Sequence, residues 1–146
     1  MNSATAWPLS AILLALSGVM VMAIGLFFLF LRAPFLPEDL HYIGVSLPQI
    51  EGVVPRLLLW LPHVFRVLGG FALATGVLTF TLAVTSFRAR QLGAAIGASV
   101  AGAASIGLMA IINVIIDSDH KWRLLAIAAV WALSLMLFWR KRKSHH

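Results

Sequence analysis

The sequence predicts an all-α integral membrane protein, a bundle of four antiparallel helices with an amphipathic, proline-rich loop between the first two. The chain of 146 residues is 61% hydrophobic and only 11% charged, which is too little polar surface for a soluble domain. Four apolar runs reach the length of about 20 residues that a spanning helix needs. The expected spans are about 9–31, 64–87, 92–116 and 122–139, within a single transmembrane domain, 1–146.

The distribution of charge predicts the orientation of these spans. All five acidic residues lie in the connections after the first and third spans: Glu38, Asp39, Glu51, Asp117 and Asp119. Five basic residues in and beside the same connections balance them. The net charge of +6 therefore belongs to Arg88, Arg90 and the basic run 140–143. Because cytoplasmic loops carry the excess of Lys and Arg, we expect both termini in the cytoplasm, with the chain in a bacterial cytoplasmic (inner) membrane.

Composition also excludes several classes of protein. The chain has no cysteine, so disulfides, thiolate metal sites and cysteine redox chemistry are excluded. A small basic rim beside the membrane attracts lipid headgroups and makes no groove for a nucleic acid. The first apolar run lacks a basic leader and exceeds the ~7–15 residues of a signal peptide, so we interpret it as a retained helix.

The first two spans are separated by a connection, 33–62, that holds five of the six prolines. The first helix follows Trp7-Pro8 and should end before Pro34, because the residue preceding a proline avoids helical geometry. Within the connection, Pro37-Glu38-Asp39 reads as a helix start with acids over the positive dipole end. Ser46-Leu47-Pro48-Gln49 has the spacing of a capping box. We expect short amphipathic helices in the membrane interface or over the mouth of the bundle.

Small residues mark the faces along which helices should pack. Two sets in the third span repeat every four residues: Gly93, Gly97, Ala101 and Ser105, and also Ala94, Ala98 and Gly102. This spacing lets two helix backbones approach closely in a membrane. The partner can be a helix of the same chain or of another copy. The fourth span is framed by Trp122 and Trp139, which is typical of the aromatic belts at the two membrane surfaces.

Four polar residues should meet on the acidic side of the bundle. His63 and Arg66 lie three apart in the second span, and Asn113 and Asp117 lie four apart in the third. One interpretation is a structural ion pair between Arg66 and Asp117, since a buried arginine needs a carboxylate. The other is a ligand site, roofed by the 33–62 loop, for an anionic headgroup, a quinone head or a small acid.

The segment Asp117-Ser118-Asp119-His120 brings oxygen and imidazole groups together, as a metal site would. A metal also needs ligands from elsewhere in the fold and groups that orient them. We predict a solvated helix cap and no metal.

A glycine motif in the second span, Arg66-x-x-Gly69-Gly70-x-x-x-x-x-Gly76, follows the proline-rich loop and precedes a Gly/Ala-rich helix. This layout resembles the small four-helix bacterial membrane proteins grouped as DoxX-like. The founding members of that group are linked to membrane sulfur oxidation with quinone as acceptor. The resemblance implies that Arg66, Gly69 and Gly70 form a helix-packing and headgroup-facing element. It carries no activity over to this chain.

These observations favour a non-enzymatic accessory or assembly subunit that associates through its small-residue faces with itself or with a larger membrane complex. The alternative is a lipid- or quinone-binding membrane protein or enzyme with the polar site at the outer leaflet. A small-solute transporter is the second alternative, although no span carries a continuous polar stripe. No cofactor is predicted apart from a bound lipid or quinone under the first alternative.

Overall fold

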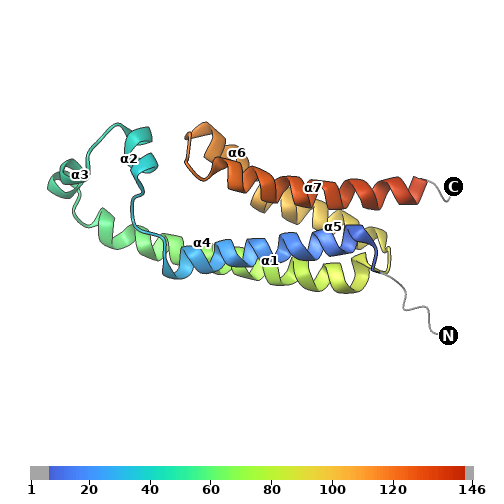
Figure 1. The fold of residues 1–146 in the computed structure, drawn as a ribbon. Helices are drawn as coiled ribbons and strands as arrows, with labels where there is room; N and C mark the ends of the chain where they lie inside the picture. The colour runs from blue at the N-terminus through green and yellow to red at the C-terminus, as the bar shows by residue number, and fades with distance from the viewer. Residues whose placement is uncertain (1–6, 144–146) are drawn as a thin grey trace.

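The computed structural model describes residues 7–143, and every regular element within them is a helix. Four long helical stretches run alternately in opposite directions, and the start of the first and the end of the last lie at the same end of the molecule (Figure 1). The first half consists of α1 (Leu9–Phe30), α2 (Pro37–Ile43), α3 (Leu47–Val53), α4 (Leu57–Leu82) and the π-helical turn η1 (Ala83–Phe87). The second half consists of α5 (Leu92–Gly102), the π-helical turn η2 (Ala103–Gly107), α6 (Leu108–Ile115) and α7 (Lys121–Lys143).

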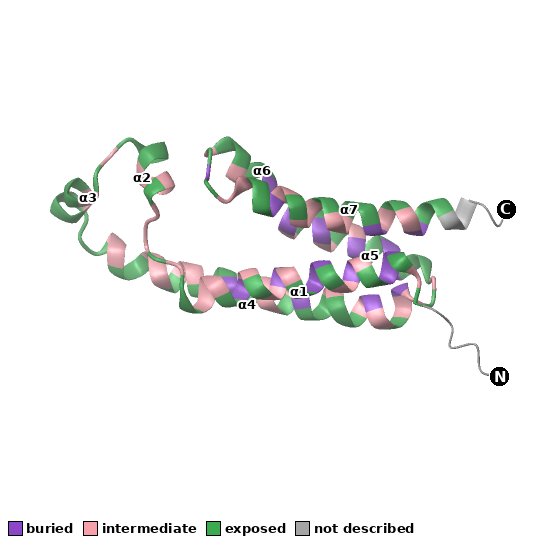
Figure 2. Ribbon diagram, in the orientation of Figure 1, coloured by how far each residue is buried: buried purple, intermediate pink, exposed green. Residues whose placement is uncertain are grey.

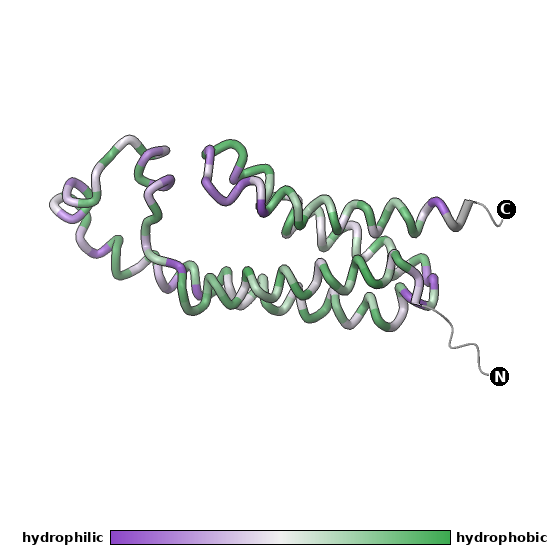
Figure 3. Tube along the Cα trace, viewed as in Figure 1, coloured by the Kyte–Doolittle hydropathy of each residue, from purple (hydrophilic) through white to green (hydrophobic). Residues whose placement is uncertain are grey.

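Four helical stretches are long and apolar enough to cross a membrane: Leu9–Phe30, Leu57–Phe87, Leu92–Ile115 and Lys121–Arg140. Three of them agree with the predicted spans to within one residue at each end. Figure 3 shows hydrophobic colours along all four and hydrophilic ones in the connections. The predicted number and type of the long helices are thus confirmed.

The second long helix begins at Leu57 and not at the predicted residue 64. Pro62 therefore lies inside α4, where the sequence interpretation placed the end of a loop. A proline in a helix removes one backbone hydrogen bond, here to the carbonyl of Leu58, and the loss is tolerated in the second turn. Both short helices begin at the predicted positions. The side chain of Asp39 accepts a hydrogen bond from the backbone N–H of Leu36 at 2.8 Å, at the start of α2. The side chain of Gln49 accepts one from the backbone N–H of Ser46 at 2.7 Å, at the start of α3.

Helices α1 and α4 are in direct backbone contact along a line of glycines. A Cβ added to Gly25 would lie 2.5 Å from the backbone nitrogen of Leu73, and one on Gly76 would lie 2.7 Å from the carbonyl of Gly18. A Cβ added to Gly69 would likewise lie 2.8 Å from the carbonyl oxygen of Gly25. In each helix the two glycines are seven residues apart, so they fall on one face. This contact requires the absence of a side chain, and it fixes the register of the pair.

The end of the molecule that holds the Arg88–Arg90 turn, here called the basic end, has a closed core. The ring centroids of Phe87 and Phe138 lie 4.6 Å apart, and both side chains are buried. The other buried members are small or aliphatic: Ala11, Leu14, Ala83, Ala94, Ala95 and Ala98. Arg88 lies over the ring of Trp7 at 4.3 Å, and Arg90 over that of Phe138 at 5.0 Å. Of the predicted basic run 140–143, the structure describes only the side chain of Arg140.

The two small-residue faces of the third span differ in burial. Ala94, Ala98 and Gly102 are buried, and the indole of Trp131 lies against Gly102 and donates a hydrogen bond to the carbonyl of Ala98 at 3.0 Å. On the other face Gly93 and Gly97 are exposed, whereas Ala101 and Ser105 are half-buried. Figure 2 shows buried positions concentrated where the long helices meet, and exposed ones on their outer sides.

Candidate functional site

A cavity of about 500 Å³ lies between α1, the α6–α7 hairpin and the start of the α1–α4 connection. It occupies the end of the molecule opposite the basic end, here called the acidic end. Most of its walls are apolar side chains: Met20, Ala23, Ile24, Phe27, Phe28, Leu36, Phe65, Met109, Ile116, Leu124 and Ile127. A volume of this size is within the range of small-molecule pockets, which are commonly apolar with a few convergent polar groups.

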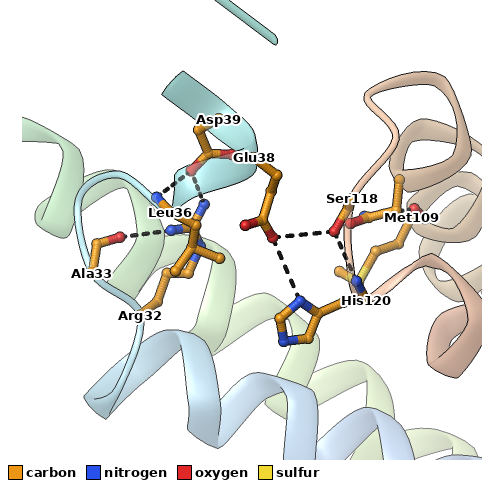
Figure 4. Close-up of polar contacts among 9 residues, drawn as sticks. Arg32, Ala33, Leu36, Glu38, Asp39, Met109, Ser118 and His120 are labelled. Atoms are coloured by element: carbon orange, nitrogen blue, oxygen red, sulfur yellow. Dashed lines mark hydrogen bonds and ion pairs between the residues drawn. The ribbon is translucent and has the colours of Figure 1, made fainter. Parts of the chain in front are cut away.

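The polar groups of the cavity are Arg32, Glu38, Asp39, Asn113, Ser118, His120 and Arg123. They come from two regions far apart in the sequence: the segment 32–39, which joins α1 to α2, and the segment 113–123 around the α6–α7 turn. Figure 4 shows Arg32 and Asp39 on one side of this group, and Ser118 and His120 on the other, with Glu38 between them.

Arg32 follows α1, and two nitrogens of its guanidinium are engaged by neighbouring groups. It donates to Asp39 Oδ2 at 2.6 Å and to the carbonyl of Ala33 at 2.7 Å. It also lies over the ring of Phe65 at 4.5 Å, and its side chain is only 8% exposed. A buried guanidinium of this kind needs a carboxylate and further hydrogen bonds, and Asp39 meets the first requirement.

Glu38 joins α2 to the turn between α6 and α7. Its Oε1 accepts the hydroxyl of Ser118 at 3.2 Å and lies 3.4 Å from Nδ1 of His120. The side chain of Glu38 is 9% exposed, and Ser118 is buried. The backbone N–H of His120 in turn donates to the Ser118 hydroxyl at 3.1 Å. A short polar network thus closes one end of the apolar cavity.

The local backbone explains why Ser118 faces this network. Asp117 adopts a left-handed conformation with φ of 54°. The N–H of Ser118 bonds to the carbonyl of Asn113 at 2.9 Å, and that of Asp117 to Val114 at 3.2 Å. This is the Schellman pattern that ends many helices. It reverses the chain just after α6, so Ser118 turns inward while the Asp117 side chain stays exposed.

The predicted ion pair between Arg66 and Asp117 does not form in the described part of the chain. Asp117 pairs with Lys121 instead, and this hydrogen bond, together with the positive charge of Lys121, lowers the pKa of Asp117 below its ordinary value. The helix ends at Ile115, so Asp117 does not extend the face that carries Asn113. Arg66 and His63 are both exposed on α4.

Asn113 is thus the one member of the predicted set that lines the cavity, and its amide donates to the carbonyl of Met109 at 2.9 Å. Arg32, Ser118 and His120 were not predicted as cavity residues, and Glu38 and Asp39 were predicted to mark a helix start and the acidic side of the bundle. These residues share one feature that the sequence shows: all of them lie next to the acidic end of a span. No spacing rule links residues that lie 80 positions apart.

Within residues 7–143, no group of three or more His, Asp or Glu side chains is placed to hold a metal ion. The arrangement instead suits an amphiphilic molecule, whose apolar part would fill the walls and whose head would meet the polar network. The segment Asp117–His120 contributes to this network through Ser118 and His120.

Four helices of spanning length and apolarity, in an all-helical chain, are the coarse features of a multipass membrane protein. Comparison of the chain with models of known protein families, with curated proteins and with solved structures found no match. The resemblance to DoxX-like proteins stays a prediction.

Proposed function

We propose that this chain is a multipass membrane protein of four antiparallel spans that binds an amphiphilic small molecule, a lipid or a quinone, in the cavity at its acidic end. The observation that carries the proposal is the cavity itself, with apolar walls and a polar network gathered at one end. Membrane bundles commonly build ligand sites between facing helices.

The orientation we propose places the acidic end, and with it the cavity, in the outer leaflet of a bacterial inner membrane. The contacts of Arg88 with Trp7 and of Arg90 with Phe138 gather the start of α1, the α4–α5 turn and the end of α7 at the basic end. An excess of basic residues marks the cytoplasmic side of a membrane protein. The charge pattern therefore supports cytoplasmic termini.

The test is native mass spectrometry of the protein extracted gently from its own membrane, with a cavity-filling variant beside it. Ala23 lines the cavity and is exposed toward it, so Ala23→Phe should fill space without disturbing the helix contacts. Ala126 on α7 is exposed and lies outside the cavity lining, so Ala126→Phe is the matched control. We expect a stoichiometric lipid or quinone on the wild type and on Ala126→Phe, and its loss from Ala23→Phe. Equal retention by both variants would contradict the proposal.

A second candidate function, an accessory or assembly subunit, is supported by the outer face of α5. A Cβ added to Gly93 would meet nothing within 4 Å, and one on Gly97 would meet only a methyl group of Leu82 at 4.0 Å. Exposed glycines at this spacing are typical of helix–helix interfaces in membranes. The face is open to a second copy or to a helix of a larger complex.

This second candidate is tested by Gly97→Leu, because the open space lets the monomer accept the larger side chain. Gly70 is also exposed, and a Cβ added to it would meet nothing within 4 Å, so Gly70→Leu on α4 is the control. Association through α5 predicts that Gly97→Leu dissociates an oligomer or complex that Gly70→Leu leaves intact, as measured by native mass spectrometry. An unchanged assembly in Gly97→Leu would remove this candidate.

A further inference from the structure

We infer that the cavity selects its amphiphile by the head group, favouring an uncharged or cationic head that donates hydrogen bonds, a hydroxyl or an ammonium, over a carboxylate or phosphate. This inference rests on the proposed binding function and specifies its ligand class. It follows from which charged groups at the polar end are already engaged and which still have capacity for a partner.

The guanidinium of Arg32 in the cavity wall is already paired with a carboxylate. Two nitrogens of Arg32 donate to Asp39 and to the carbonyl of Ala33, and one face of the guanidinium covers Phe65. An anionic head would have to compete with Asp39, which also holds the first turn of α2 through the N–H of Leu36. The other cavity arginine, Arg123, is exposed in the first turn of α7, so its charge is open to the surroundings of the protein as well as to the cavity.

The negative charge of Glu38, by contrast, has unused capacity. Its Oε1 receives both contacts, from Ser118 and His120, while Oε2 accepts no hydrogen bond from the described residues. Figure 4 shows this second oxygen turned away from Ser118 and His120. A carboxylate offers about four acceptor positions, and polar groups buried in proteins normally find partners. The side chain is 9% exposed, so a donor brought by the ligand is the natural partner.

The same carboxylate disfavours an anionic head. Two like charges a few ångströms apart repel strongly where apolar walls lower the local dielectric constant. A hydroxyl avoids this repulsion and donates to Oε2, and an ammonium adds charge attraction and contact with the rings of Phe27 and Phe28 at the cavity wall. Both heads carry a hydrogen-bond donor, and Oε2 of Glu38 receives none from the described residues.

The experiment is photo-crosslinking of the full chain in lipid nanodiscs with three alkyl probes. The probes carry the same diazirine and the same chain, and end in a hydroxyl, an amine or a carboxylate. Adducts are mapped by mass spectrometry to the cavity peptides around Phe27 and Met109, and to exposed α4 around Leu78 as a lipid-facing reference. We expect cavity labelling by the hydroxyl and amine probes to exceed that by the carboxylate by roughly tenfold, the effect of one hydrogen bond to a charged group.

Substitution of Glu38 identifies the residue responsible. Glu38→Gln should abolish the advantage of the amine probe over the carboxylate, whereas Glu51→Gln should leave all three probes unchanged. Glu51 is the matched control because it is an exposed acid in the same connection. Because the comparison of head groups is made on the wild type, the inference can fail even if Glu38→Gln does not fold.

Two results would overturn the inference while leaving the proposed function standing. One is equal cavity labelling by all three probes. The other is preferred labelling by the carboxylate that disappears in Arg123→Gln, which would make Arg123 the recognising group. If no probe labels the cavity above the lipid-facing reference, the proposed function fails and this inference fails with it.

Discussion

The two ends of this molecule use the same four long helices and differ in the size of the side chains between them. At the basic end, alanines let the helices close around Phe87 and Phe138, which are almost completely buried. At the acidic end, bulky side chains such as Phe28 and Phe65, whose rings lie 5.9 Å apart, line a cavity of about 500 Å³. Small residues in the interface thus bring helices together, and aromatic ones leave space for a ligand between them.

The comparison also separates stability from function. A core without space contributes packing energy, since interiors at this density lose contacts when any side chain is trimmed. A cavity lacks those contacts, and a ligand that fills it would supply them. We therefore expect substitutions at the basic end to act on folding, and those at the acidic end to act on binding and on the position of α2.

The largest effect should come from the same truncation made at each end. Phe138→Ala removes a ring that is 1% exposed and in contact with Phe87, and comparable changes in protein cores cost about 3–5 kcal/mol. Phe27→Ala trims a half-buried ring that already borders a cavity, so its cost should be clearly smaller. Thermal unfolding in detergent, followed by circular dichroism, measures both. Equal losses would show that the two ends are packed alike.

The glycine contact that holds α1 to α4 gives the next largest effect. In Gly25→Ala the new methyl group would collide with the backbone of Leu73, and overpacking of this kind costs about 1–3 kcal/mol. Gly70→Ala enters open space and should gain up to about 1 kcal/mol from helix propensity. The same unfolding assay compares them. If Gly25→Ala left the unfolding temperature unchanged, the two helices would be able to move apart freely.

At the acidic end, α2 has no buried residue, so the contacts of Glu38 are its main attachment to the α6–α7 turn. Glu38→Gln removes the charge that holds Ser118 and His120, and we expect the opening equilibrium of α2 to rise roughly tenfold. Hydrogen–deuterium exchange of the α2 amides measures this opening, with Glu51→Gln as the control. Unchanged exchange in Glu38→Gln would show that α2 is held by other contacts.

The smallest effect concerns the exposed pair at the α6–α7 turn. Lys121 lowers the pKa of Asp117, so the pair stabilises the folded state above the ordinary pKa of an aspartate, and this contribution is lost as the pH falls through the lowered value. Lys121→Met should raise the pKa of Asp117 toward its ordinary value and remove this acid sensitivity. An NMR titration of the Asp117 carboxyl measures the shift, and an unchanged midpoint would exclude Lys121 as the cause.

The spans and the two short helices were predictable because each depends on local signals. Hydrophobic run length determines a spanning helix, and Pro37 and the Ser46–Gln49 pair mark helix starts through groups within one turn. The start of α4 was wrong by seven residues because Pro62 was taken as a boundary. A proline near a helix start removes only one hydrogen bond, so it is a weak stop signal there.

The polar site was less predictable because it depends on helix rotation and on one turn. The pairing of Arg66 with Asp117 assumed that the third span continues as a helix to residue 117, whereas a left-handed residue ends it. The glycines that pack α1 on α4 repeat every seven residues, and their partners lie on a different helix. Sequence spacing identifies which residues share a face, but the partner of that face follows from the packed structure.

The length of α4 has a consequence for the bilayer itself. The stretch Leu57–Phe87 has 31 residues and α1 has 22, so in a fixed register the former extends about 14 Å farther, and it does so at the acidic end. Because the glycines hold the two helices together, a tilt would act on both and would not remove their difference in length. In a bilayer, the lipid around Leu59 and Trp60 would then have to adapt to the longer helix. Membrane thickness would consequently set how deep the mouth of the cavity lies, and how readily lipids reach it.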